Sequence, residues 1–234
     1  MLDVQNLSKR FGGLTAVRDL SFNVPRNTIL GMIGVNGAGK TTVMNCINGL
    51  YDADTGKIVL DGRDISGQSA HEIAHAGLGR TFQVPRIFRR MTLVDNLRAT
   101  VLHRKESGRA QIERAEALLE RVSLSQLREN YAEELSGGQQ KLLELARVMM
   151  FDPPFVMLDE PFAGVNPQLC NVLIDHIQGL LAEGKTFLLV SHDLNSIYRL
   201  SNHIIVLNQG QKIAEGSAEE IRRNPEVIEA YLGS

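Results

Sequence analysis

Gly34-Val35-Asn36-Gly37-Ala38-Gly39-Lys40-Thr41-Thr42 is a glycine-rich run that fits the phosphate-binding pattern G-x-x-x-x-G-K-[ST]. The apolar residues 29–33 before it predict a buried strand, and residues 42–50 after it favour a helix. A strand that leads through such a loop into a helix N-terminus directs several backbone N–H groups at one point, where a polyphosphate binds. The run therefore predicts a P-loop, and with it a nucleoside triphosphate site.

Individual residues of the loop have separate expected roles. Gly37 and Gly39 allow the backbone to close around the phosphates, Lys40 reaches the β- and γ-phosphate oxygens, and the Thr41 hydroxyl suits Mg²⁺. The full set of loop residues expected to contact the nucleotide is Gly34, Asn36, Gly37, Ala38, Gly39, Lys40, Thr41 and Thr42.

Composition narrows the class of protein. The 234 residues carry 25 Lys+Arg and 27 Asp+Glu, a net charge of −2, which does not support a general nucleic-acid binder. Two cysteines without a CxxC pair are typical of a reducing cytosol. We expect no signal peptide, and no apolar stretch approaches the ~20 residues needed to cross a bilayer. If the protein works at a membrane, another chain must span it.

Hydrophobic spacing predicts an α/β chain. Strands are expected at 2–7, 14–24, 29–33, 57–62, 78–82, 155–158, 187–190, 203–208 and 211–215. Helices are expected at 42–50, 69–76, 92–104, 109–122, from 136 onward, and at 167–182, 217–223 and 225–232. The mostly helical stretch 84–150 interrupts the alternation, so we interpret it as a helical subdomain inserted within one domain that spans 1–234.

Leu135-Ser136-Gly137-Gly138-Gln139 is expected to begin the last long helix of that stretch. Ser136 is a natural N-cap, and Gln139 three residues later completes a capping box. Two glycines in the first turn cost about 1 kcal/mol each relative to alanine. A helix start with a purely structural role does not need them, so we interpret them as leaving space for a phosphate that belongs to something else.

Further candidate site residues follow buried strands or a tight turn. Asp159 and Glu160 follow an apolar strand downstream of the P-loop, the Walker B arrangement, in which the first acid holds Mg²⁺ and the second polarises a water. His192 follows the next strand, at the strand end where parallel sheets carry ligands, and suits a γ-phosphate contact. Phe11, just before a Gly-Gly turn, fits stacking on a base, and equally fits a core aromatic.

In order along the chain, Phe11, the P-loop, Gln83, the run Leu135–Gln139, Asp159-Glu160 and His192 resemble the motifs of the ATP-binding cassette (ABC) ATPases. The resemblance covers essentially the whole chain. It implies the family's fold: a P-loop NTPase with a RecA-like α/β core, an antiparallel β-subdomain, and a helical subdomain between the Gln83 loop and the signature run Leu135–Gln139.

The same resemblance implies how the site works. Two cassettes would pair head to tail, with each ATP between the P-loop of one chain and Ser136, Gly137, Gly138 and Gln139 of the other. Catalysis would use Glu160 as general base, Gln83 on the metal and the attacking water, and His192 on the γ-phosphate. Mg²⁺ would be held by Thr41, Gln83 and Asp159.

Four stretches narrow the resemblance to ATPase subunits of branched-chain amino-acid importers: Arg10–Leu14, Gly79–Gln83, Met157–Pro167 and Asn224–Gly233. Urea-importer and lipopolysaccharide-exporter ATPases share parts of them. The segment 100–112 is shorter than usual for this subgroup, which leaves the membrane partner open. The implied partners are a second cassette, identical or homologous, permease subunits and, indirectly, a solute-binding protein, with the chain at the cytoplasmic face of the membrane.

The permease contact is expected beside the Gln83 loop, where apolar residues from Val84 to Met91 alternate with arginines. An ordinary packed loop is the alternative there. A soluble ABC protein that acts in repair or translation is the competing function, although such proteins usually carry two cassettes or a long coiled coil. A P-loop kinase or GTPase is disfavoured by the signature run and by the lack of an Asn-Lys-x-Asp motif.

Overall fold

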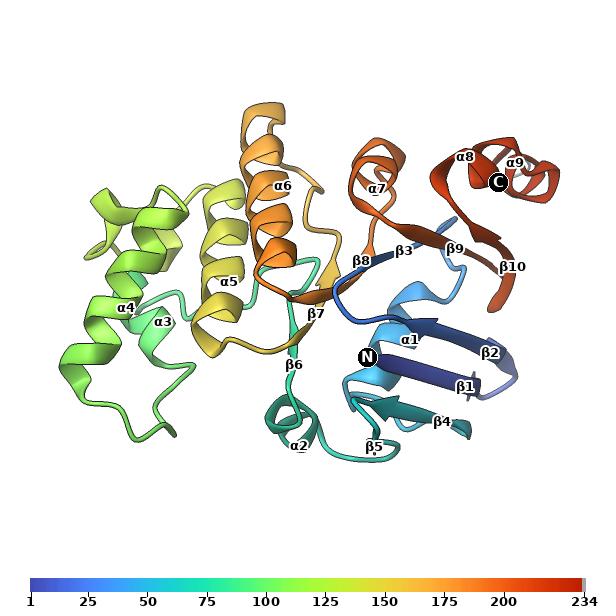
Figure 1. The fold of residues 1–234 in the computed structure, drawn as a ribbon, viewed down its shortest axis with the longest axis horizontal. Helices are drawn as coiled ribbons and strands as arrows, with labels where there is room; N and C mark the ends of the chain where they lie inside the picture. The colour runs from blue at the N-terminus through green and yellow to red at the C-terminus, as the bar shows by residue number, and fades with distance from the viewer. Residues whose placement is uncertain (233–234) are drawn as a thin grey trace.

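The computed structural model describes residues 1–232, and a six-stranded sheet runs through its centre (Figure 1). Its strand order is β10-β9-β3-β8-β7-β6, in which only β10 and β9 pair antiparallel. The strands are β3 (Ile29–Gly34), β6 (Leu78–Arg80), β7 (Phe155–Asp159), β8 (Thr186–Val190), β9 (His203–Asn208) and β10 (Gln211–Gly216). Every residue of β3, β7 and β8 is buried, as expected for parallel strands covered on both faces.

A second, antiparallel sheet packs against one side of this core. It has the order β2-β1-β4-β5, formed by β1 (Leu2–Phe11), β2 (Leu14–Val24), β4 (Thr55–Leu60) and β5 (Arg63–Asp64). Helix α1 (Lys40–Ile47) belongs to the apolar core between the two sheets, and α2 (Ala70–His75) lies near β6 (Figure 1). The other side of the central sheet is covered by α5 (Gly137–Phe151), α6 (Pro167–Ala182) and α7 (Leu194–Leu200).

Alternate side chains of the central strands fill two apolar layers, one on each face of the sheet. Within β3, Leu30 and Met32 belong to the cluster that contains α1 and the second sheet. Ile29 and Ile33 belong to the cluster that contains α5, α6 and α7. Because successive side chains of a strand point to opposite faces, an uninterrupted apolar run fills both layers.

The remaining helices lie at the two ends of the molecule. Helices α3 (Leu93–Arg98) and α4 (Gly108–Arg121) lie with α5 at one end, and α8 (Ala218–Arg223) and α9 (Pro225–Leu232) lie at the other, beside β10 (Figure 1). The expected architecture, an α/β core with an antiparallel sheet and a group of helices at one end, is thus confirmed, while the subdomain limits 84–150 stay a prediction. Within residues 1–232 no helix is both long enough and apolar enough to cross a bilayer.

The helix predicted over 92–104 is shorter than expected. It ends at Arg98, because the backbone then closes two tight turns, in which Thr100 N–H donates to Leu97 C=O and Val101 N–H to Arg98 C=O, both at 3.0 Å. The Thr100 hydroxyl also donates to the Leu97 carbonyl at 2.7 Å. A threonine side chain that bonds to nearby backbone in this way competes with helix continuation.

Asn96 ties the segment after β6 to α3. Its side chain is completely buried, accepts the Phe88 N–H at 2.9 Å, and donates to the carbonyl oxygens of Phe88, Met91 and Thr92. A buried amide with this many backbone partners sets the path of the segment 88–92.

We predict that Asn96→Leu lowers the free energy of unfolding by about 2–4 kcal/mol, because it leaves a buried N–H and buried carbonyls without partners. Urea denaturation followed by circular dichroism measures the change. The matched control is Gln178→Leu, an amide on the exposed face of α6, which should change stability by less than about 0.5 kcal/mol. Equal effects of the two substitutions would contradict the role assigned to Asn96.

Candidate functional site

The carboxyl ends of β3, β7 and β8 meet at one edge of the central sheet. In the register of the parallel strands, Val190 pairs with Met32 on one side and with Asp159 on the other. The residues that follow these positions therefore leave the sheet side by side, which brings the P-loop, Glu160 and His192 together.

A cleft of about 970 Å³ lies at this edge. Most of the predicted site residues line it: Phe11, Asn36, Gly37, Ala38, Gly39, Lys40, Thr41, Thr42, Gln83, Asp159, Glu160 and His192. Gly34 lies at the base of the loop and contacts Lys40. Sequence reasoning missed other lining residues, among them Ala16, Arg18 and Gln209, because they are brought here from a neighbouring strand and a hairpin turn.

The predicted signature residues Ser136–Gln139 do not line this cleft. They begin α5, where Ser136 caps the helix by accepting the Gln139 N–H and the Gln139 side chain accepts the Ser136 N–H in return. Ser136 and Gly137 are exposed to solvent. The predicted capping box is confirmed, and each molecule presents the cleft and the signature as separate surfaces.

The two signature glycines have different surroundings. A Cβ at Gly137 would meet nothing within 4 Å, whereas a Cβ at Gly138 would lie 2.3 Å from Leu169 Cδ2. A side chain at Gly138 would therefore require the end of the Leu169 side chain on α6 to move. The open space above Gly137 fits the interpretation that a glycine here leaves room for an external group.

The P-loop needs glycine where the chain passes other backbone closely. Gly39 has φ +102°, and a Cβ there would lie 2.6 Å from the carbonyl oxygen of Ala16. A side chain at this position would be strained and would also collide with β2. The loop is thus held closely against β2.

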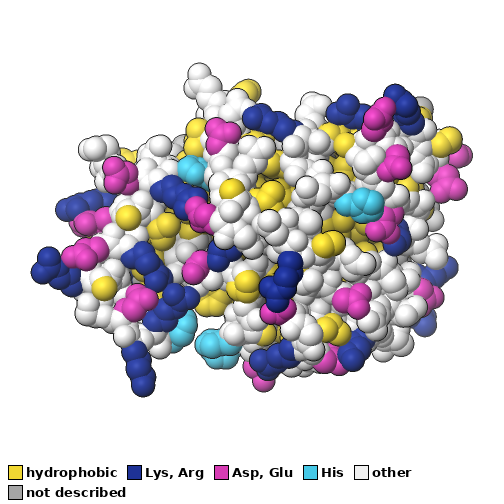
Figure 2. All heavy atoms as spheres, viewed as in Figure 1, with side chains coloured by type: hydrophobic (Ala, Val, Ile, Leu, Met, Phe, Trp, Pro, Cys, Tyr) yellow, Lys and Arg dark blue, Asp and Glu magenta, His cyan; other side chains and the backbone are white. Residues whose placement is uncertain are grey.

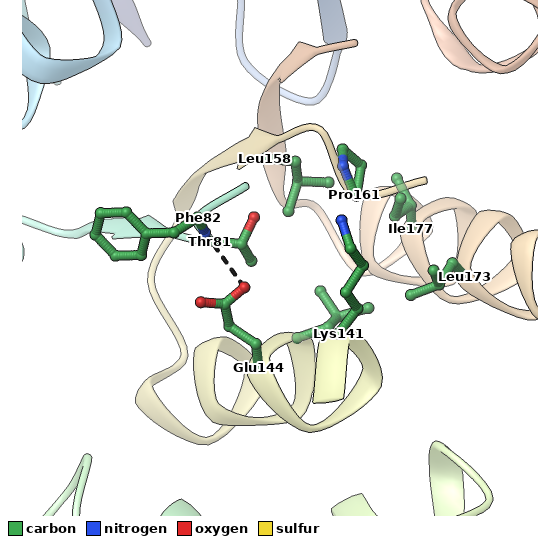
Figure 3. Close-up of a pocket in the computed structure, with 9 residues that line it drawn as sticks. Thr81, Phe82, Lys141, Glu144, Leu158, Pro161, Leu173 and Ile177 are labelled. Carbon is green, nitrogen blue, oxygen red and sulfur yellow. Dashed lines mark hydrogen bonds between the residues drawn. The ribbon is translucent and has the colours of Figure 1, made fainter. Parts of the chain in front are cut away.

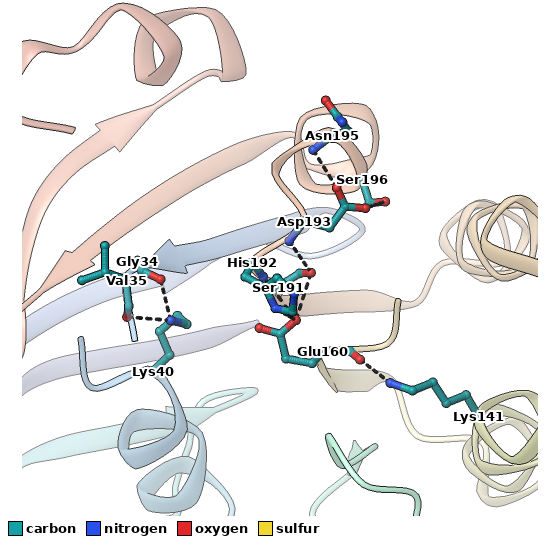
Figure 4. Close-up of polar contacts among 10 residues, drawn as sticks. All are labelled: Gly34, Val35, Lys40, Lys141, Glu160, Ser191, His192, Asp193, Asn195 and Ser196. Atoms are coloured by element: carbon teal, nitrogen blue, oxygen red, sulfur yellow. Dashed lines mark hydrogen bonds and ion pairs between the residues drawn. The ribbon is translucent and has the colours of Figure 1, made fainter. Parts of the chain in front are cut away.

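Lys40 lies folded over the loop (Figure 4). Its Nζ donates to the carbonyl oxygens of Gly34 at 2.6 Å and Val35 at 3.0 Å. Since an ammonium group has three donors, one hydrogen remains for a ligand oxygen. Burial lowers the pKa of Lys40, and the carboxylates of Glu160 and Asp159 oppose that shift.

Glu160 has an unusual backbone for a glutamate, with φ +49°. A non-glycine residue in the left-handed region costs about 1 kcal/mol or more, and such strain is concentrated at functional sites. The backbone N–H donates to the Val190 carbonyl at 2.8 Å, and the carbonyl oxygen accepts from Lys141 Nζ at 2.5 Å. Both contacts hold the residue in this conformation.

The polar contacts of the Glu160 carboxylate are made by one of its oxygens, Oε2 (Figure 4). Oε2 accepts from the Ser191 hydroxyl and from the His192 N–H, each at 3.2 Å, and lies 2.8 Å from His192 Nδ1. Oε1 has none of these contacts and is available to a water in the cleft. Sequence reasoning missed Ser191, because a small polar residue between a strand and a histidine belongs to no recognisable motif.

Asp159 forms a buried ion pair that the sequence did not reveal. Arg80 donates to Asp159 Oδ2 at 2.9 Å and to Asn45 Oδ1 at 2.7 Å, so it joins β6 and β7 to α1. Both charged side chains are almost fully buried. Burial lowers the pKa of Arg80, and Asp159 opposes that shift by hydrogen bonding and by its charge.

The donor set of the cleft fits Mg²⁺ bound together with a polyphosphate. Among residues 1–232 no three or more His, Cys, Asp or Glu side chains gather as a metal site. The cleft instead offers the Thr41 hydroxyl, the Gln83 amide oxygen and the Asp159 carboxylate. Mg²⁺ usually takes one or two such protein ligands and completes its shell with phosphate oxygens and waters.

Phe11 lies at the outer rim of the cleft, 43% exposed. Its ring meets Tyr51 edge to face, with centroids 5.2 Å apart, and Lys9 Nζ lies 5.4 Å from its centroid. An aromatic ring supported from behind and open in front is suited to stacking on a planar base. The alternative of a core aromatic at this position is wrong.

Comparisons with known proteins agree with this geometry. The family model described as ABC transporter matches residues 17–163, and the model described as branched-chain amino acid ATP-binding cassette transporter matches residues 211–234.

Two relatives in sequence match the chain along its full length. The high-affinity branched-chain amino acid transport ATP-binding protein BraF of Pseudomonas aeruginosa is 43% identical, over all of this chain and 98% of that protein. The probable branched-chain amino acid transport ATP-binding protein LivG of Archaeoglobus fulgidus is 41% identical, over all of this chain and 96% of that protein.

A solved structure matches equally fully. The crystal structure of a nucleotide-free ATP-binding cassette from an ABC transporter superposes with a TM-score of 0.90 at 35% identity, covering all of this chain and 99% of that one. The similarity covers the full chain in sequence and in structure, and the P-loop and the Walker B acids line one cleft. These observations together indicate a single family. This chain belongs to the ABC transporter family, as one of its ATP-binding cassette ATPases.

Proposed function

We propose that this chain is the ATP-hydrolysing subunit of a transporter that imports branched-chain amino acids. The relatives at 41–43% identity are named as branched-chain amino acid transport ATP-binding proteins, and the family model of a branched-chain amino acid ATP-binding cassette transporter matches the 24 residues 211–234. The observation that carries the ATPase is the cleft itself, which joins the P-loop to Asp159, Glu160 and His192.

The active unit is two cassettes arranged head to tail. The cleft of one chain lacks the signature, and the signature of the same chain is exposed at the start of α5. A helix N-terminus presents free N–H groups and the positive end of its dipole, which suit a phosphate. ATP bound in one cleft would therefore be closed over by Ser136–Gln139 of the second chain.

Within the cleft each residue has a distinct task. Loop N–H groups and Lys40 bind the β- and γ-phosphates, and Phe11 stacks on the adenine. Glu160 Oε1 orients the attacking water and accepts its proton, while His192 holds Oε2 and contacts the γ-phosphate. Thr41, Gln83 and Asp159 would hold Mg²⁺, which, when bound, supplies charge that stabilises the transferring phosphoryl group.

Membrane attachment is assigned to the segment 84–91 and to separate permease subunits at the cytoplasmic face of the membrane. Val84 is 73% exposed and Phe88 48% exposed, next to exposed arginines at 86, 89 and 90. Large exposed apolar side chains rimmed by charge are typical of protein contacts. Elsewhere, acidic and basic side chains are interspersed over the face shown in Figure 2.

We predict that Glu160→Gln lowers ATP hydrolysis about 100-fold or more and changes ATP affinity by less than about threefold, because the amide keeps the shape but cannot accept a proton. Phosphate release and equilibrium nucleotide binding measure the two quantities. Glu219→Gln, an exposed acid on α8, is the control and should hydrolyse at the wild-type rate. Wild-type hydrolysis by Glu160→Gln would show that another group is the base.

We predict that Glu160→Gln forms an ATP-dependent dimer and that adding Ser136→Arg abolishes it, because a long side chain fills the space above the helix N-terminus. Size-exclusion chromatography with light scattering measures the mass with and without ATP. Gln126→Arg, at an exposed position of the helical region, should leave the dimer intact. A dimer that persists with Arg at 136 would contradict head-to-tail closure over the signature.

We predict that Phe88→Asp releases the chain from membranes of cells that express its permease, because a charge in an apolar contact is costly to desolvate. The amount of chain in washed membranes, measured by immunoblot, should fall about tenfold. Leu102→Asp is the control, because it places the same charge at another exposed apolar residue, outside the segment 84–91. The Leu102→Asp chain should stay bound to the membranes. Unchanged binding of Phe88→Asp would exclude this segment as the attachment surface.

A further inference from the structure

One face of the signature helix carries charged side chains that reach beyond the helix. Lys141, Glu144 and Arg147 recur every three residues along α5, and all three contact backbone of other segments. Figure 3 shows Lys141 and Glu144 rising from the helix towards Phe82 and Pro161, the neighbours of Gln83 and Glu160. Neither Lys141 nor Glu144 was predicted from the sequence to be a functional residue.

Lys141 holds the backbone of Glu160. Its side chain is buried, and Nζ donates to the Glu160 carbonyl oxygen at 2.5 Å (Figure 4). Glu160 is the residue with φ +49°, and its carbonyl is turned towards α5. A charge-assisted hydrogen bond to this carbonyl stabilises the strained backbone conformation of Glu160, which the residues of β7 before it do not adopt.

Glu144 holds the loop that carries Gln83. It is 5% exposed, and its two carboxylate oxygens accept the N–H of Phe82 at 3.2 Å and the N–H of Arg86 at 3.0 Å. These bonds lie on either side of Gln83 in the chain. Burial raises the pKa of Glu144, and the two N–H donors oppose that shift, so they support the charged form.

An ordinary packing role does not account for these groups. Burying a lysine and a glutamate costs free energy, and apolar side chains of similar size would join α5 to the sheet at least as well. The cavity beside them is lined by Leu145, Leu158, Leu173 and Ile177, so apolar packing is already present at this place. What the two charges add is directed hydrogen bonding to two functional loops.

We propose that Lys141 and Glu144 are positioning residues that place Glu160 and the Gln83 loop together in response to the signature helix. The proposal rests on the function proposed above. An α-helix rises about 1.5 Å per residue, so Lys141 lies only about 7.5 Å along α5 from Ser136. Closure of a second cassette on the signature would therefore be transmitted through one rigid helix to the base and to Gln83 of the same chain.

The first test separates positioning from nucleotide binding. In the full-length chain, Lys141→Met should lower kcat for ATP hydrolysis about tenfold or more, with nucleotide affinity and the thermal midpoint little changed, and Lys141→Arg should restore kcat to within about threefold. The matched control is Arg104→Met, which removes a donor to the Phe151 carbonyl at the far end of α5 and should leave kcat within about twofold.

A purely structural role for Lys141 would lower the thermal midpoint and nucleotide affinity together, and Lys141→Arg would not restore kcat selectively. Either result would overturn the proposal. If the wild-type chain does not hydrolyse ATP, the proposed function fails, and the second test alone decides whether Glu144 holds the loop.

The second test needs no hydrolysis. A spin label on Val84→Cys, in a chain with Cys170→Ser so that the only other thiol is the buried Cys46, reports the motion of the Gln83 loop. Glu144→Ala should narrow the spectral lines, which indicates faster motion of the loop backbone, and Arg104→Met should leave the line widths unchanged. An unchanged spectrum in Glu144→Ala would show that the loop is held without this carboxylate and would overturn the proposal.

Discussion

The parallel pairing of β3, β8 and β7 is the constraint on which the site depends. Their register places Met32, Val190 and Asp159 in line, so the chain leaves three buried strands at one edge. Backbone hydrogen bonds inside a sheet allow little adjustment, because a one-residue slip would turn every buried side chain to the opposite face. The register of these strands therefore brings the P-loop, Glu160 and His192 together at one edge of the sheet.

Around this edge the protein buries charge in an ordered way. Arg80 joins Asp159 to Asn45, Lys141 holds the Glu160 carbonyl, and Glu144 accepts N–H groups on both sides of Gln83. Each buried charge has specific partners, which is the condition under which its desolvation is offset. Because these contacts join the P-loop helix, the Walker B strand and the signature helix, a displacement of any one of them is felt at the others.

Prediction from the sequence succeeded where local rules determine the secondary structure. It was less accurate where side chains compete for the backbone hydrogen bonds of a helix. The capping box at Ser136 and the buried strands appeared as predicted, since a short motif or an apolar run is sufficient for each. The helix predicted to reach 104 ends at Arg98, where Thr100 bonds to the Leu97 carbonyl. Arg80 lies in a stretch that marks the family, yet its partner Asp159 is 79 residues away and no spacing rule connects them.

Local residue patterns were enough to predict a P-loop, a Walker B pair, a capped signature helix and an α/β chain. These features depend on residues that are neighbours in sequence, whose backbone geometry and side-chain chemistry act over one turn of helix or one strand. Tertiary structure alone decided that Ser191 and His192 share one oxygen of Glu160, that Leu169 packs against Gly138, and that Lys141 and Glu144 join the signature helix to the cleft. Such contacts unite distant segments, and only the packing of the helices on the sheet brings them within hydrogen-bonding distance.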